Sequence, residues 1–346
     1  MKIARFRGFK KGFILEETVK PVIQTNEVLV RVKCCAVSGT DSYRYREYEN
    51  PTVRPFADGE TPGHEIAGLV EAMGSSVTTC AVGDKVVIQP FWGCGTCSFC
   101  KAGRENFCPD IKAFGFHVPG GFSEYLSVRE DIVLVIDHRV SCEEAVPAHH
   151  VAVNLHGLKA SGVTFGADTS VAVFGAGNLG LLMVMMLTSM GVSKIFAVDI
   201  ERTRLACARE LSPCMTINAR DGDPAEVLLR TTDGRGVDVS VELAGGSAPT
   251  IDPAIRATRK GGTYIAIAVR NENDTLPFLQ VLRQHLRVQG SSTHTLKEMK
   301  ESLAMIEDGR VTTRKIISHS FPLEEINHAF DCRLDDPEAL YVMVDL

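Results

Sequence analysis

Short apolar runs that alternate with polar positions dominate the chain up to Val140. These runs lie at residues 27–37, 64–72, 85–89, 122–128 and 132–136. Turn-forming residues separate them, as in the pairs Pro62-Gly63 and Gly83-Asp84. Short alternating runs between such turn signals are typical of strands that bury one face. We therefore predict a β-rich unit of barrel-like or sandwich-like form in this part of the chain.

The pattern changes at Ser141, where apolar strands begin to alternate with helices. Ser141 and Glu144 have the spacing of a capping box, which predicts a helix that continues to about Ala160. Apolar strands are then predicted at 170–174, 194–198, 237–243 and 263–269, with helices at 179–190, 201–211 and 249–258. Continuous apolar strands that alternate with helices indicate a parallel sheet covered on both faces. A helix at 296–307 and a strand at 340–344 end the chain.

Composition narrows the class of protein further. The 346 residues are enough for about two domains. With 45% hydrophobic residues, 23% charged residues and a net charge of −6, the chain is neither disordered nor a candidate for nucleic-acid binding. The apolar stretch 179–187 is too short to cross a bilayer, and no signal-like run follows the N-terminus. We expect a cytoplasmic protein without a membrane partner, in which clustered cysteines bind metal rather than form disulfides.

A strand that enters a glycine-rich turn predicts a dinucleotide site. Gly175, Gly177 and Gly180 form the pattern G-x-G-x-x-G between a predicted strand and a predicted helix. They would allow the tight turn, the approach of a pyrophosphate and close helix–strand packing, respectively. Asp199 ends the next strand, about 20 residues on, where a carboxylate accepts from a ribose hydroxyl and favours NAD over NADP. The alternative is a turn selected for packing alone, with Asp199 as a helix cap.

Four cysteines are clustered within a loop-like segment. Cys94, Cys97, Cys100 and Cys108 are separated by gaps of two, two and seven residues. Four thiolates suit a tetrahedral zinc ion, and closed sites of this kind are structural. An iron–sulfur cluster is the alternative, although the final gap of the corresponding ferredoxin pattern is three residues.

Together with Pro62-Gly63-His64-Glu65, these features resemble the zinc-dependent alcohol dehydrogenase superfamily, the medium-chain dehydrogenases, and within it the sorbitol and threonine dehydrogenase branch. The resemblance covers essentially the whole chain. It implies a GroES-like β-barrel catalytic domain over residues 1–146, with a structural zinc lobe at about 91–110. It also implies a Rossmann NAD-binding domain over 147–288 and a return segment over 289–346 that completes the catalytic domain. The active site, with a catalytic zinc, is then expected in the cleft between the domains.

Two of the three positions of the family's catalytic zinc ligands are altered in this chain. Ser38 replaces the usual cysteine, His64 is retained and is followed by Glu65, and His149 stands where the family has glutamate. Serine is a poor zinc ligand, whereas two histidines and a glutamate form a complete set. One hypothesis is therefore a rewired zinc site made of His64, Glu65 and His149.

The second hypothesis is that the catalytic zinc has been lost. His149, His150 or Thr40 would then supply hydrogen bonds or a proton to a carbonyl group. A third interpretation makes His149 and His150 ordinary residues at the start of a helix.

The resemblance assigns roles to several further residues. Thr40 would contact the substrate oxygen and begin a proton relay, and Asp41 would orient His64. Tyr43 occupies the position of a relay histidine, so that the relay would be altered. Arg204 would contact the cofactor. The segments that would line the nicotinamide contain Ile267, Ala268, Val269, Ser291, Ser292 and Thr293. Polyol dehydrogenases have arginine at the Thr293 position, which argues against sorbitol itself as the substrate.

These observations predict an oxidoreductase that uses NAD(H) to interconvert a small polar secondary alcohol, such as a polyol, cyclitol or amino sugar, with its ketone. Two alternatives remain: a family member that binds NAD without catalysis, and a zinc-independent reductase of activated double bonds. Relatives imply a homodimer or homotetramer.

Overall fold

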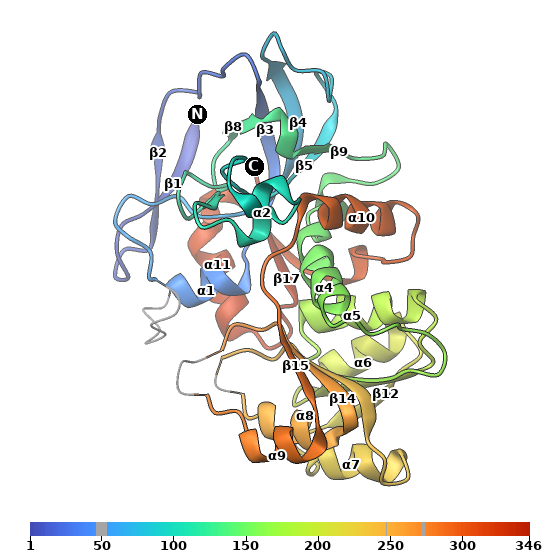
Figure 1. The fold of residues 1–346 in the computed structure, drawn as a ribbon. Helices are drawn as coiled ribbons and strands as arrows, with labels where there is room; N and C mark the ends of the chain where they lie inside the picture. Colours follow the sequence, from blue (N-terminus) through green and yellow to red (C-terminus); the bar gives the residue numbers. More distant parts are fainter. Residues whose placement is uncertain (46–53, 247, 271–273) are drawn as a thin grey trace. The chain divides into compact units, whose positions relative to one another are not determined.

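The computed structural model describes residues 1–45, 54–246, 248–270 and 274–346. These residues form two compact units (Figure 1). The first unit contains residues 1–149 together with 295–346, and the second contains residues 150–294. The chain therefore leaves the first unit within one helix and returns to it after His294.

A largely antiparallel sheet is the centre of the first unit. Along the sheet, the strands follow the order β16-β17-β3-β4-β5-β9, and β8 also pairs with β3. Their bounds are β3 Glu27–Ala36, β4 Glu65–Met73, β5 Lys85–Ile88, β8 Tyr125–Arg129, β9 Val133–Val135, β16 Ile317–Pro322 and β17 Tyr341–Asp345. Each strand predicted from the apolar runs is present. Two hairpin pairs were not predicted: β1 (Lys2–Phe6) with β2 (Phe13–Glu17), and β6 (Phe91–Trp92) with β7 (Lys112–Ala113).

Contacts in the first unit join the two ends of the chain. The ring centroids of Phe13 in β2 and Phe330 in α11 (Ile326–Asp335) are 4.8 Å apart in the core. The side-chain amide of Asn327 pairs with the backbone of Phe13, since its Oδ1 accepts from the Phe13 N–H at 2.7 Å and its Nδ2 donates to the Phe13 carbonyl at 2.9 Å. The side chain of Asn327 thereby pairs with the backbone of β2 as a neighbouring strand would, and it attaches the N-terminal hairpin to α11.

The helical segment after Ser141 differs from its prediction. The capping box is confirmed, because the Ser141 hydroxyl accepts from the Glu144 N–H and the Glu144 carboxylate accepts from the Ser141 N–H. However, the structure has two helices, α3 (Cys142–Ala145) and α4 (Ala148–Ala160), rather than one. The interruption contains Pro147, which lacks the N–H that a continuous helix requires. The new start places His149 in the first turn of α4.

The second unit is a doubly wound parallel sheet, as predicted. Its order is β12-β11-β10-β13-β14-β15, with all pairings parallel. The strands are β10 Ser170–Phe174, β11 Lys194–Asp199, β12 Met215–Asn218, β13 Val237–Glu242, β14 Thr258–Ala266 and β15 Arg287–Gly290. The helices are α5 Asn178–Ser189, α6 Arg202–Leu211, α7 Pro224–Thr231, α8 Ile251–Ala257 and α9 Phe278–Gln284. The prediction was wrong about where the strand at 263–269 begins, since it starts directly after α8.

Asp238 links three neighbouring strands of this sheet. Its Oδ2 accepts from the Ser170 N–H at 2.8 Å and the Ser170 hydroxyl at 2.6 Å, and its Oδ1 accepts from Arg259 Nε at 2.6 Å. Burial raises the pKa of Asp238, but the hydrogen bonds from Arg259 and Ser170 outweigh it and lower that pKa to about 2. The ionised form of Asp238 therefore stabilises the fold.

We expect this contribution to disappear on acidification. A carboxyl group whose pKa is lowered by folding stabilises the native state above its unfolded pKa, and the effect is lost as the pH falls from about 4 to about 2. Asp238→Asn should lower the melting temperature at neutral pH and flatten its decline in this acid range. Thermal unfolding from pH 7 to 2 measures both. The exposed Asp168→Asn is the control, and equal acid slopes in wild type and Asp238→Asn would contradict this role.

Candidate functional site

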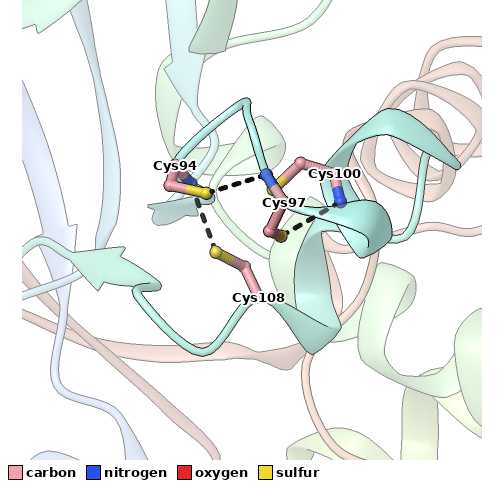
Figure 2. Close-up of side chains that lie close together, drawn as sticks. All are labelled: Cys94, Cys97, Cys100 and Cys108. Carbon is pink, nitrogen blue, oxygen red and sulfur yellow. Dashed lines mark hydrogen bonds between the residues drawn. The ribbon is translucent and has the colours of Figure 1, made fainter.

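The four clustered cysteines converge on one point (Figure 2). Their sulfur atoms all lie within 4.8 Å of one another. Backbone N–H groups donate to these sulfurs: Cys97 to Cys94 Sγ at 3.4 Å, Cys100 to Cys97 Sγ at 3.5 Å, and Cys94 to Cys108 Sγ at 3.2 Å. Hydrogen bonds from Thr96 and the Cys97 N–H lower the pKa of the Cys94 thiol to about 6. Burial instead raises the pKa of the Cys100 thiol to about 12, so that these hydrogen bonds favour the thiolate at Cys94 in particular.

The geometry fits a single ion. Zinc–sulfur bonds of 2.3 Å in a tetrahedron put the sulfurs about 3.8 Å apart, which matches the close approach seen here. Cysteines that each ligate a different iron of a cluster are spread more widely, because the cluster lies between them. Gly93 is required beside the sulfurs, since a Cβ there would lie 2.4 Å from Cys100 Sγ.

A second donor group lies in the same unit, formed by His64, Glu65 and His149. One ligand atom from each lies within 4.8 Å of the others, and all three residues are buried. Glu65 begins β4, and His149 is in the first turn of α4. The ring planes of His64 and His149 are nearly perpendicular, with centroids 5.5 Å apart. The structure therefore brings together the three residues of the rewired-site hypothesis.

The environment of this group is unusual for ionisable side chains. Burial raises the pKa of Glu65 to about 8, while a hydrogen bond from the hydroxyl of Tyr341 opposes this effect. Burial also lowers the pKa of His64. The buried Nδ1 of His64 has no hydrogen-bond partner among the described residues. Two imidazoles and a carboxylate, with His64 Nε2 4.0 Å from Glu65 Oε1, form a donor set that fits a zinc ion.

Residues in and just before helix α1 (Gly39–Tyr45) contact one another beside the group of His64, Glu65 and His149. The hydroxyl of Ser38 donates to Asp41 Oδ2 at 2.8 Å and accepts from the Asp41 N–H at 2.9 Å, so that it is committed to the start of the helix. Asp41 Oδ2 lies 3.6 Å from His64 Nδ1 without a hydrogen bond. Asp41 thus lies beside His64, and its expected role of orienting that ring stays a prediction. Thr40 and Tyr43 are half-buried on α1.

The glycine-rich turn of the second unit shows why each glycine is needed. Gly175 has a φ of 101°, and a Cβ there would lie 2.7 Å from the backbone nitrogen of Ala244. A Cβ at Gly180 would lie 1.8 Å from the Gly175 carbonyl oxygen. At Gly177, which caps α5, a Cβ would meet no atom within 4 Å. Packing therefore accounts for Gly175 and Gly180, whereas Gly177 keeps open the space in front of the helix N-terminus.

Asp199 is attached to this turn. Its Oδ2 accepts from the Ala176 N–H at 2.6 Å and its Oδ1 accepts from the Glu201 N–H at 2.8 Å. The carboxylate therefore lies between the glycine-rich turn and the start of α6, where Arg204 is half-buried. The Asp199 carboxylate accepts hydrogen bonds from the backbone on both sides and also places a negative charge at this edge of the sheet.

The two other segments expected to contact a cofactor follow strands of the same sheet. The N–H groups of Ile267 and Ala268 both donate to the Glu242 carbonyl at 3.2 Å, and the Ser291 N–H donates to the Ala266 carbonyl at 2.8 Å. Ile267 is buried and Val269 is exposed. Ser292 is exposed and precedes Thr293, which has a φ of 61°. A left-handed backbone is costly for a β-branched residue, and such strain is concentrated at functional sites.

Two residues near these sites were missed by sequence reasoning. Tyr341 reaches Glu65 across 276 positions of sequence, a pairing without a local signal. Glu242 ends β13, is buried, and accepts from Thr250 Oγ1 at 2.8 Å and Arg270 Nη1 at 3.2 Å. An acidic residue at the carboxyl end of an apolar strand was its only available signal.

Comparison with known proteins establishes the family. Residues 24–138 match the model of the alcohol dehydrogenase GroES-like domain, and residues 178–308 match that of the zinc-binding dehydrogenases. An alcohol dehydrogenase of Geobacillus stearothermophilus is 32% identical over 96% of this chain and 95% of its own. The chain belongs to the zinc-dependent alcohol dehydrogenase superfamily. This medium-chain dehydrogenase is therefore an oxidoreductase of small molecules that uses a pyridine nucleotide and zinc.

Two further relatives of this dehydrogenase are similar over nearly the full chain. A sorbitol dehydrogenase of Bacillus subtilis is 30% identical over 95% of this chain and 93% of its own. The structure of a protein described as a zinc-binding dehydrogenase, from Sinorhizobium meliloti 1021 and bound to NADP, is 27% identical with a TM-score of 0.89. That match covers 100% of this chain and 99% of the other. In the described part of this dehydrogenase, no helix is long and apolar enough to cross a membrane.

Proposed function

We propose that this dehydrogenase uses NAD(H) to interconvert a small polar secondary alcohol, of the polyol, cyclitol or amino-sugar class, with its ketone. The observation that carries the proposal is the buried group of His64, Glu65 and His149, whose donor atoms converge within 4.8 Å. A non-catalytic NAD-binding protein would have no need to bury three such donors together. Similarity to a sorbitol dehydrogenase supports the substrate class.

Two zinc sites per chain are part of this proposal. Cys94, Cys97, Cys100 and Cys108 would hold a structural ion, and His64, Glu65 and His149 would hold the catalytic one. When bound there, zinc supplies a Lewis acid that lowers the pKa of an alcohol hydroxyl. The three-donor set would leave a coordination position for substrate, as catalytic zinc sites require.

The protein's own residues would handle the proton and the hydride acceptor. When bound, NAD would supply the acceptor for the hydride that leaves the substrate carbon in oxidation, and the hydroxyl proton would leave to solvent. Thr40, half-buried on α1, would accept the hydroxyl proton and pass it outward, and Tyr43 would take the following place in the relay. Ser38 would hold α1 in place through Asp41 rather than serve as a ligand.

Turnover of the nicotinamide tests the proposed reaction. Absorbance of the reduced nicotinamide should change with a panel of polyols, inositols and amino sugars, and more strongly than with ethanol. Calorimetric binding of NAD without turnover on any alcohol or ketone would favour the non-catalytic alternative. Turnover on conjugated enones that survives strong chelation would favour the zinc-independent reductase.

Asp199 is proposed to select NAD by accepting from the ribose 2′-hydroxyl and repelling a 2′-phosphate. Ile267, Ala268, Val269, Ser291, Ser292 and Thr293 would line the nicotinamide, and Arg204 would contact the cofactor. Two charges of the same sign a few ångströms apart repel by a few kcal/mol near a protein surface, so Asp199→Asn should shift the kcat/KM ratio towards NADP by about ten- to a hundredfold. Glu201→Gln, which removes a neighbouring carboxylate, is the control. An unchanged ratio in Asp199→Asn would refute this role.

We propose that copies of the chain associate into a homodimer or homotetramer through the edge of the parallel sheet. β15 is an edge strand, and Phe278, Leu279 and Leu282 of α9 are each more than half exposed. Exposed apolar surface beside an unpaired strand is typical of an interface. Light scattering should show an oligomer, and Val288→Lys in β15 should shift it towards the monomer. We also propose a reducing, cytoplasmic location, in which clustered cysteines bind metal rather than form disulfides.

A further inference from the structure

A third group of metal-type donors lies in the first unit, formed by His319, Cys332 and Asp336. His319 belongs to the edge strand β16, Cys332 to α11, and Asp336 caps the end of that helix. One imidazole nitrogen, the thiol sulfur and one carboxylate oxygen lie within 4.8 Å of one another. All three residues are partly exposed, so that an ion from solvent can reach them. The mechanism proposed above uses none of them.

The ring of His319 is oriented by a neighbouring hydroxyl. His319 Nδ1 lies 3.0 Å from Ser318 Oγ, which accepts from the Leu340 N–H at 2.9 Å and donates to the Tyr341 carbonyl at 3.4 Å. The ring therefore contacts Ser318 through Nδ1, and its Nε2 lies 3.5 Å from the carboxylate of Asp336. Histidine ligands of metal ions have this arrangement, in which the protein holds the second ring nitrogen.

The carboxylate of Asp336 is oriented in the same way. Its Oδ1 accepts from the Glu338 N–H at 2.8 Å, and its Oδ2 lies 3.5 Å from His319 Nε2. Two ligands of one tetrahedral zinc ion, with bonds near 2.0 Å, lie about 3.3 Å apart. The separation of the two atoms therefore suits a shared ion, and the Cys332 sulfur supplies a third donor from the same helix.

We propose that His319, Cys332 and Asp336 form a surface site for Zn²⁺ or a similar borderline-soft divalent cation, with water in the remaining coordination position. Imidazole and thiolate donors favour such ions over Mg²⁺ or Ca²⁺, which prefer sites made wholly of oxygen. The bound ion would join the edge strand β16 to helix α11. This proposal is independent of the reaction proposed above, since it involves neither zinc site of that proposal.

Alkylation of Cys332, followed peptide by peptide with mass spectrometry, tests the site without interference from the other zinc sites. Zn²⁺ is titrated against the purified protein, and the rate of iodoacetamide modification at Cys332 is measured. At tenfold excess over the dissociation constant, mass action predicts that alkylation slows about tenfold. His319→Gln and Asp336→Asn should abolish protection. Ser318→Ala should raise the zinc concentration needed for protection by about tenfold, as loss of an outer-shell partner does.

The controls separate a metal site from a simple ion pair. His328→Gln changes an exposed histidine of the same helix outside the donor group and should leave protection intact. Mg²⁺ in place of Zn²⁺ should give no protection. The proposal is overturned if Zn²⁺ leaves the alkylation rate of wild-type Cys332 unchanged. It is equally overturned if Zn²⁺ still protects Cys332 in both His319→Gln and Asp336→Asn. In these variants, alkylation of Cys332 without metal at the wild-type rate verifies that the segment is folded.

Discussion

Replacement of Cys108 by serine will release one zinc ion per chain and disorder the loop around residues 93–108. The short helices of this loop, α2 (Ser98–Lys101) and η1 (Glu105–Phe107), bury none of their residues, and Phe99 and Phe107 remain substantially exposed. These two helices therefore lack a hydrophobic core of their own, and the proposed zinc ion would supply stability to the loop. In small zinc domains, such binding contributes about 10–16 kcal/mol to folding at neutral pH.

Three measurements check this prediction. Zinc content should fall by one ion per chain, proteases should cut within the loop, and the melting temperature should decrease. Cys214→Ser, which removes a cysteine outside the cluster, should retain both zinc and protease resistance. If Cys108→Ser keeps its full zinc content and an intact loop, the four-cysteine site is not a zinc site. An iron–sulfur cluster would instead show iron and a visible absorption band in the wild type.

Replacement of His149 by alanine will remove the other zinc ion and lower kcat by about 10²- to 10⁴-fold, as expected when several kcal/mol of Lewis-acid stabilisation are lost. His149 supplies one of only three donors, so that the remaining His64 and Glu65 would bind an ion weakly. His149→Glu should restore both the zinc and part of the activity, because a carboxylate oxygen is a competent zinc ligand.

His156→Gln, further along the same helix and outside the donor group, is the matched control and should bind two zinc ions. A wild-type protein with one zinc ion and full turnover would remove the rewired site. The hypothesis of a lost catalytic zinc would then apply, in which His149, His150 or Thr40 acts through hydrogen bonds. In that case His149→Ala should reduce turnover without any change in zinc content.

The sequence predicted elements best where periodicity and flanking signals agreed. Strand Ser170–Phe174 and helix Leu296–Glu307 have the predicted bounds, because an uninterrupted apolar run and a capping box define them. Strand β12 was missed, since its four residues, MTIN, are too few to show a period. Helix α9 was missed because its seven residues are too few to show a helical period clearly.

Only those parts of the candidate site that belong to a sequence motif could be predicted. The convergence of the four cysteines follows from their spacing, and the tasks of Gly175 and Gly180 follow from the turn. By contrast, Tyr341 contacts Glu65 across 276 positions, a contact that only the tertiary fold creates. Ser38 and Asp41 form a local pair at the start of a helix, which their spacing could have predicted. Both contacts of the Ser38 hydroxyl are to Asp41, whose carboxylate also lies 3.6 Å from His64 Nδ1, so the expected role of Asp41 beside His64 stays a prediction.

The placement of β17 between β16 and β3 has a consequence for how the protein is made. Residues 150–294 are contiguous, so this half can acquire its native form while the ribosome is still translating the remainder. The N-terminal portion must wait, since its sheet is completed by residues that emerge last. A nascent chain stalled before β17 would therefore expose the unpaired end of β3, Cys34 to Ala36, to chaperones.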